Sequence, residues 1–136
     1  MEQELTIESS RSGGELRLSW SHQTGVRYRT QYLNVSLEDC ELAAARSRIY
    51  VYEPNDLLRF FAELASQWKG WAGEKEWNSV EGDLGLSCTS DSLGHVAMRV
   101  KLKSGIDQDD WCVQTVIHID AGQLEELALI VKAFLY

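Results

Sequence analysis

The sequence predicts an α+β protein in which a mostly antiparallel sheet of about eight strands carries two packed helices. Apolar and polar residues alternate with a period of two over most of the chain. The helical spacing i, i+3, i+4, i+7 interrupts this alternation twice and gives the order ββββα-ββββα. Short turns separate successive strands, and such turns join antiparallel neighbours.

Four strands are expected before the first helix. Leu5 and Ile7 alternate with polar neighbours, and Leu16, Leu18 and Trp20 do the same after a glycine-containing hairpin loop. One apolar face per strand indicates packing against a core. The expected strands cover residues 4–8, 15–20, about 27–37 and about 42–52.

The period changes at Pro54, where the first helix is expected to begin. Proline is suited to the first helical turn, and the negative charge of Asp56 is favourable at the positive end of a helix. An apolar stripe runs from Leu57 to Trp68, so the Trp68 side chain is expected in the core. Gly70 is suited to terminating the helix.

Four more strands and a second helix follow. The third of these strands has one apolar and one basic face, whereas the last is apolar on both faces and is therefore expected to be central in the sheet. Asp120 with Gln123 resembles a capping box before the apolar stripe of the second helix. The strands cover residues 77–81, 84–89, 95–103 and 111–119, and the helix stripe lies within 124–135.

The 136 residues are expected to form a single domain, 1–136, with possible half repeats 1–70 and 71–136, because the two helix stripes superpose at an offset of 67. With 44% hydrophobic residues, a chain of this length can form a stable hydrophobic core without a structural metal ion or disulfide bonds. Neither a signal peptide nor a membrane-spanning segment is expected, since no basic n-region opens the chain and no apolar run is long enough.

The cysteines Cys40, Cys88 and Cys112 lack metal-binding or disulfide spacing. We expect all three cysteine side chains to be buried as small apolar groups and to stay reduced in the cytoplasm. The sequence also lacks phosphate-binding, dinucleotide, zinc-protease, serine-hydrolase and calcium-loop motifs. Most enzymes of those classes are thereby excluded, and neither a cofactor nor a metal ion is expected.

Negative charge is concentrated near the end of the chain. The net charge is −8 from 13 basic and 21 acidic residues. An acidic cluster before Trp111 is open to two interpretations, a cation or partner-docking site and a solvated hairpin tip. Trp71 is either a plug on the helix end or an exposed anchor. The candidate partner-binding residues are Asp107, Asp109, Asp110, Glu125, Glu126 and Trp71.

Two other candidate sites remain open at this point. His95 with nearby carboxylates could serve a small enzyme or ligand-binding domain, although no nucleophile can be assigned beside it. Arginines and tyrosines interleave between Arg27 and Tyr52, as on nucleic-acid-binding surfaces. The net charge opposes phosphate binding, so we expect this segment to form the solvated face of strands, on which the arginines, among them Arg46 and Arg48, lie over tyrosines and pair with acids.

Residues 69–84 read KGWAGEKEWNSVEGDL and are followed by Gly94, His95 and Val96. This pattern resembles a family of small bacterial proteins that is defined only as a domain of unknown function. The glycine–histidine strand and Gln123-Leu124 remotely resemble the WapI-type immunity proteins. That resemblance implies a non-catalytic cytoplasmic protein that binds and neutralises a cognate toxin. An acidic chain is suited to a basic partner through electrostatic steering. We therefore expect a protein partner, and neither nucleic acid nor membrane.

Overall fold

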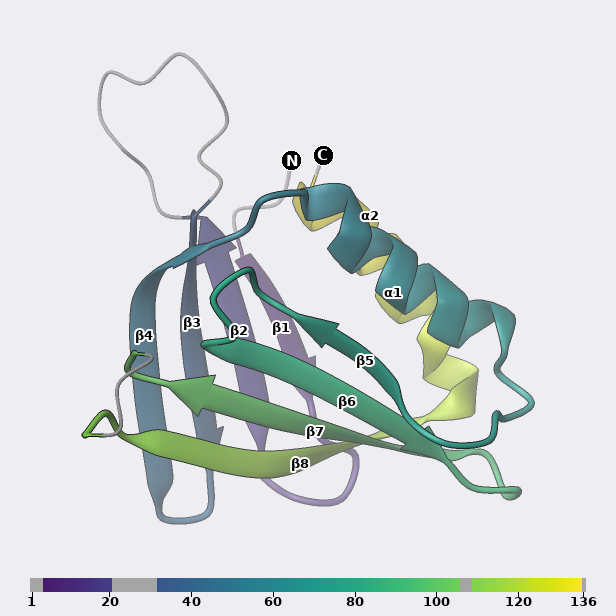
Figure 1. The fold of residues 1–136 in the computed structure, drawn as a ribbon. Coiled ribbons are helices and arrows are strands. Elements are labelled where there is room, and N and C mark those ends of the chain that lie inside the picture. The colour runs from purple at the N-terminus through teal and green to yellow at the C-terminus, as the bar shows by residue number, and fades with distance from the viewer. Residues whose placement is uncertain (1–3, 21–31, 106–108, 136) are drawn as a thin grey trace.

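The structure is a computed structural model that describes residues 4–20, 32–105 and 109–135. It confirms the α+β class and the order ββββα-ββββα (Figure 1). The elements are β1 (Glu4–Glu8), β2 (Glu15–Trp20), β3 (Tyr32–Asp39), β4 (Leu42–Tyr50), α1 (Pro54–Ser66), β5 (Lys75–Asn78), β6 (Leu84–Ser90), β7 (His95–Lys103), β8 (Cys112–Asp120), a 3-10 turn (Ala121–Gln123) and α2 (Leu124–Leu135).

The eight strands divide into two antiparallel sheets of four. The first sheet has the order β1-β2-β3-β4 and the second the order β5-β6-β7-β8, so each is formed by strands consecutive in sequence. In Figure 1 the second sheet lies in front of the first, and the two helices run side by side against the open end between them. β8 is therefore an edge strand, and the expectation that it is central was wrong.

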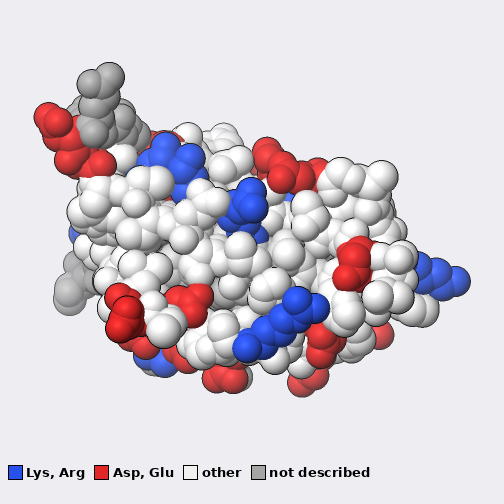
Figure 2. Space-filling model, turned by 90° about the horizontal axis from the view of Figure 1, so that it is seen from below, with Lys and Arg blue, Asp and Glu red and all other residues white. Residues whose placement is uncertain are grey.

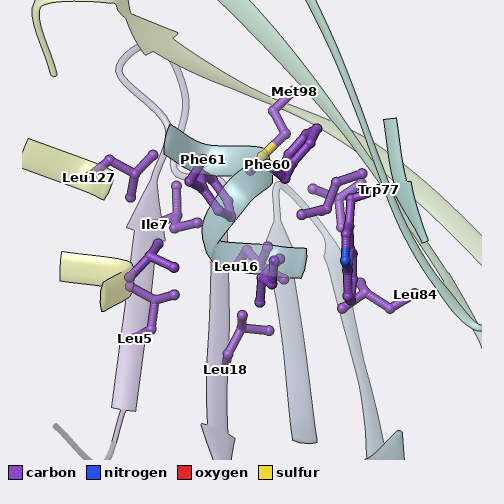
Figure 3. Close-up of a cluster of buried hydrophobic side chains, with 14 of the residues drawn as sticks. Leu5, Ile7, Leu16, Leu18, Phe60, Phe61, Trp77, Leu84, Met98 and Leu127 are labelled. Atoms are coloured by element: carbon purple, nitrogen blue, oxygen red, sulfur yellow. The ribbon is translucent and has the colours of Figure 1, made fainter. Parts of the chain in front are cut away.

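The apolar stripes of the sequence meet in one core between the sheets and the helices. Alternate residues of β1, β2, β3 and β7 are buried, and the helices contribute apolar stripes from Leu57 to Leu64 and from Leu124 to Leu135. In Figure 3, α1 lies between the two groups of strand residues, with Phe61 on the side of Ile7 and Phe60 on the side of Met98 and Trp77. Burial of each large apolar side chain contributes about 1.5–3 kcal/mol.

The prediction that Trp68 lies in the core was wrong. α1 ends at Ser66, and Gln67 at its C-cap has left the helical conformation. Trp68 therefore falls outside the helix, although it continues the helical spacing in the sequence. Its side chain is 54% exposed.

A β-bulge redirects Arg46 into the space between the sheets. Leu33 pairs with Ile49 but Val35 pairs with Arg46, so β4 carries one extra residue there. Arg48 lies in the bulge with φ 58. Residues opposite one another in an antiparallel pair share a face, which places Arg46 on the inner face with Val35.

The Arg46 guanidinium joins the two sheets. Its Nη2 lies 3.1 Å from Asp83 Oδ2, and its Nε donates to the Ser104 carbonyl at 2.9 Å. Asp83 is only 2% exposed, and the Ser79 hydroxyl donates to its second oxygen at 2.6 Å. Since a buried charge needs both an opposite charge and hydrogen bonds, this network satisfies the carboxylate of Asp83.

Further polar contacts join the sheets at other points. The Thr115 hydroxyl on β8 donates to Asp39 Oδ2 at 2.5 Å, and this bond is the main cause of a lowered pKa of Asp39. The Ser10 amide donates to the His118 carbonyl at 2.8 Å. At the other end of the core, Trp20 Nε1 donates to the Phe134 carbonyl of α2 at 3.0 Å. These bonds set the position of each sheet relative to the other and to α2.

Removal of the Asp83 carboxylate is expected to destabilise the protein strongly. Asp83→Ala leaves the Arg46 guanidinium without its ionic partner, and breaking a buried pair costs about 3–5 kcal/mol. Urea unfolding should therefore show a loss of about 3 kcal/mol. Arg17→Ala is the matched control, because its ion pairs are exposed and such pairs contribute at most about 1 kcal/mol. Equal losses in the two variants would contradict this role of Asp83.

Candidate functional site

The acidic residues singled out from the sequence lie in two separate places. Asp107 lies outside the described residues. Asp109 and Asp110 lie in the turn between β7 and β8, whereas Glu125 and Glu126 lie in the first turn of α2. The nine residues of β8 separate the two groups by about 30 Å. On the face in Figure 2, acidic and basic side chains are interspersed, and neither sign forms a continuous field.

Three segments instead converge on an open groove of about 630 Å³. The loop after α1 contributes Trp68 and Lys69, the β6–β7 turn contributes Leu93 and His95, and the junction between β8 and α2 contributes residues 120–122. Leu93 is 79% exposed beside the half-exposed Trp68. We call this feature the Trp68 groove.

Backbone geometry holds the β6–β7 turn against the helix junction. Gly94 has φ 83, a left-handed conformation that a side chain would strain. The Ala121 amide donates to the Gly94 carbonyl at 2.8 Å, and the turn is thereby fixed beside the start of α2. The groove is therefore built on backbone contacts between elements far apart in the sequence.

Asp91 organises the same turn. Its Oδ1 accepts hydrogen bonds from the amides of Leu93 at 2.8 Å and His95 at 2.9 Å. Its Oδ2 lies 2.9 Å from His95 Nδ1. The backbone hydrogen bond from His95 is the largest cause that lowers the pKa of Asp91 to about 2. The carboxylate is consequently ionised at neutral pH, and it orients the imidazole on the border of the groove.

The two tryptophans at the helix end have opposite roles. Trp71 is half-buried against the core, and its Nε1 donates to the Cys88 carbonyl at 3.1 Å. Trp71 is therefore held against the core at β6, and its expected contact with a partner stays a prediction. Trp68 is the exposed residue, with Lys69 Nζ 5.5 Å from the centre of its ring. Sequence reasoning missed Trp68 and Leu93 as surface groups, although an apolar residue in a turn between polar residues is a signal for Leu93.

The arginine–tyrosine segment forms no continuous basic surface in the described part of the chain. Residues 27–29 lie outside the described residues. Arg48 lies 5.1 Å above the ring centre of Tyr32, and Arg46 pairs with Asp83. Arg48 thus lies over a tyrosine and Arg46 pairs with an acid, as expected. Arg46 faces the space between the sheets, however, so its expected place on the solvated face of its strand was wrong.

Only one cysteine is buried as expected. Burial raises the pKa of the Cys88 thiol to about 12, so the reactive thiolate form is suppressed. Cys40 and Cys112 are exposed, so their expected burial was wrong. No cluster of three or more histidine, cysteine or acidic side chains among the described residues could hold a metal ion. No helix within the described ranges has the length and apolar character needed to cross a membrane.

The Asp91 turn is expected to stabilise the fold only while its carboxylate is ionised. The pKa in the folded protein lies below the ordinary value of 3.8, so the contribution is complete above pH 3.8 and is lost as the pH falls towards 2. Asp91→Asn keeps one oxygen acceptor but removes the charge. Its melting temperature should be lower than that of the wild type at pH 6, and the difference should narrow between pH 4 and pH 2. A difference independent of pH over that range would show that the charge has no such role.

The comparison with known proteins defines the family. No curated protein matches the chain, and no solved structure matches it. A family model described as a family of unknown function, DUF6228, matches residues 7–136. The expected membership of an uncharacterised family is thereby confirmed, whereas the resemblance to WapI-type immunity proteins stays a prediction. Because the match spans nearly the whole sequence, the chain belongs to the DUF6228 family.

Proposed function

We propose that this chain is a non-catalytic protein-binding domain that docks a basic protein partner in the Trp68 groove. The observation that carries the proposal is the exposure of Trp68 and Leu93 on one open groove. Protein interfaces concentrate binding energy in a few central apolar side chains, tryptophan above all, surrounded by a polar rim. Exposed apolar groups that border a shared groove are typical of an interaction site.

The charges around the groove favour a basic partner. Asp120 is part of its lining, Asp91 contacts His95 of the lining, and Glu125 and Glu126 follow in the first turn of α2. Lys69 and His95 are the basic groups of the lining. The chain carries a net charge of −8, so a basic protein is steered towards it at long range. Glu125 and Glu126, two of the residues singled out from the sequence, do not line the groove, and Glu126 lines a separate hollow with Thr6 and Glu8.

The biological role that we propose is that of a cytoplasmic immunity-type protein. The remote resemblance of the Gly94-His95 strand to WapI-type immunity proteins supports it, and so does the charge, since many toxins that act on nucleic acids are basic. A protein of this type neutralises its toxin by covering it. The bacterial origin, the cytoplasmic location and the toxin partner are all parts of this proposal.

The double substitution Trp68→Ser with Leu93→Ser is expected to abolish partner binding. The probe is the protein encoded directly upstream, which we expect to be basic and toxin-like, titrated calorimetrically in an inactive form. Loss of two central apolar contacts should weaken binding by at least about 30-fold, equivalent to about 2 kcal/mol. Val80→Ser is the control, because Val80 is also exposed (61%) but lies outside the groove.

Two results would refute this proposal. One is that the upstream protein does not bind the wild-type chain. The other is that the double variant binds it as tightly as Val80→Ser does. Circular dichroism of both variants establishes that they fold, so a loss of binding cannot be assigned to unfolding.

A second candidate function is the binding or turnover of a small molecule at His95. The observation that favours it is the 2.9 Å contact between Asp91 Oδ2 and His95 Nδ1, which orients the ring and leaves Nε2 to a ligand in the groove. In a thermal-shift screen of small acids and esters, this function predicts a ligand that stabilises the wild type but not His95→Ala. A ligand that stabilises both equally, or the absence of any stabilising compound, would remove this candidate.

A further inference from the structure

The outer face of the second sheet carries a trough between an acidic and a basic wall. The outward residues of the second strand, β6, are small, namely Gly85, Ser87 and Thr89. On one side β5 and the residue before it present Glu76 and Glu74, and on the other side β7 presents Arg99 and Lys101. These side chains surround a hollow of about 270 Å³.

The strand register aligns the two walls. Glu76 pairs with Ser87, which pairs with Arg99, and Asn78 pairs with Gly85, which pairs with Lys101. Each row therefore crosses the trough, and its outer members stand two strand spacings, about 9.6 Å, apart. A Cβ on Gly85 would come within 2.7 Å of Asn78 Oδ1, so glycine keeps the floor of the trough low.

The charges of both walls lack partners inside the described part of the chain. Arg17, Arg46, Arg59 and Lys75 all form ion pairs there. No described residue lies within ion-pair or hydrogen-bond distance of the charged groups of the walls, Glu74, Glu76, Arg99 and Lys101. The helices pack against the opposite face of this sheet, and they leave the outer face uncovered in Figure 1.

We propose that this face binds a second copy of the same chain in a symmetric dimer. A two-fold axis between the two sheets and parallel to the strands places β5 of each copy over β7 of the other. This axis keeps each residue at its height along the strands, so Glu76 of each copy faces Arg99 of the other, and Asn78 faces Lys101. The acid–base contact thus occurs twice, which is the self-complementarity that a two-fold interface requires. An axis perpendicular to the strands would instead set acid against acid. The small residues of β6 let the sheets approach to about 10 Å.

The area of this face indicates how stable the dimer can be. Four strands about 4.8 Å apart and about six residues long at 3.3 Å each cover about 400 Å² per copy. Stable interfaces bury about 800 Å² per partner, so the dimer belongs to the weak, concentration-dependent class. Its exposed ion pairs make it sensitive to salt.

Sedimentation velocity tests the proposal on the full chain. The wild type at low salt should shift towards twice the 15.4 kDa of the monomer as its concentration rises from about 10 µM to about 1 mM, and high salt should reverse the shift. The variants E74K/E76K and R99E/K101E should each remain monomeric, because residues 76 and 99, which face each other across the interface, then have like charge and their neighbours 74 and 101 add to the repulsion. Lys132→Glu reverses a charge elsewhere and should dimerise as the wild type does.

Recovery of the dimer distinguishes pairing of the walls from a general effect of charge. An equimolar mixture of E74K/E76K and R99E/K101E should form a heterodimer, and the quadruple variant should again form a homodimer. A monomeric wild type at the highest concentration, or dimers that persist in both double variants, would overturn the proposal. Trp68→Ser with Leu93→Ser should dimerise normally, so failure of the groove proposal and failure of this one remain separate results.

Discussion

The fold depends on one constraint, namely that neither four-stranded sheet can bury its apolar face alone. Each sheet is a meander of consecutive strands with one apolar face. The helix that follows each meander joins the other helix in the open end between the sheets, and the result is a single core. A buried face needs a partner layer, so the two halves of the chain are obliged to fold on each other.

Polar groups then determine how the layers fit. Apolar contacts are not directional, so they do not by themselves fix the angle and offset of two sheets. The network of Arg46 with Asp83 does so at one edge, and the bond from Trp20 to Phe134 does so at the helix end. The bulge in β4 is the local distortion that turns Arg46 inward, and it places Arg48 at a positive φ. The strain of the bulge thus accompanies a contact that joins the two sheets.

The same arrangement produces two surfaces of different character. The Trp68 groove lies where connecting segments converge, and it offers exposed apolar side chains beside a few polar groups. The outer face of the second sheet rests on regular strand register, and it offers charges on the two sides of a trough. The first is suited to a different protein and the second to an identical copy, so the two proposed interactions can coexist on one molecule.

The sequence by itself determined the class, the order of the elements and the identity of most core residues, because strand and helix periodicities are local properties. It also predicted that Arg48 lies over a tyrosine and that Arg46 pairs with an acid. Only the tertiary structure decided that the strands form two sheets, that β8 is an edge and that Trp68 is exposed. The spacing of Trp68 fits the apolar stripe of the helix. The helix nevertheless ends before Trp68, where its backbone hydrogen bonds stop, and the apolar periodicity does not specify that end. The groove and the charged walls likewise bring together residues from separate segments, and their proximity exists only after the chain has folded.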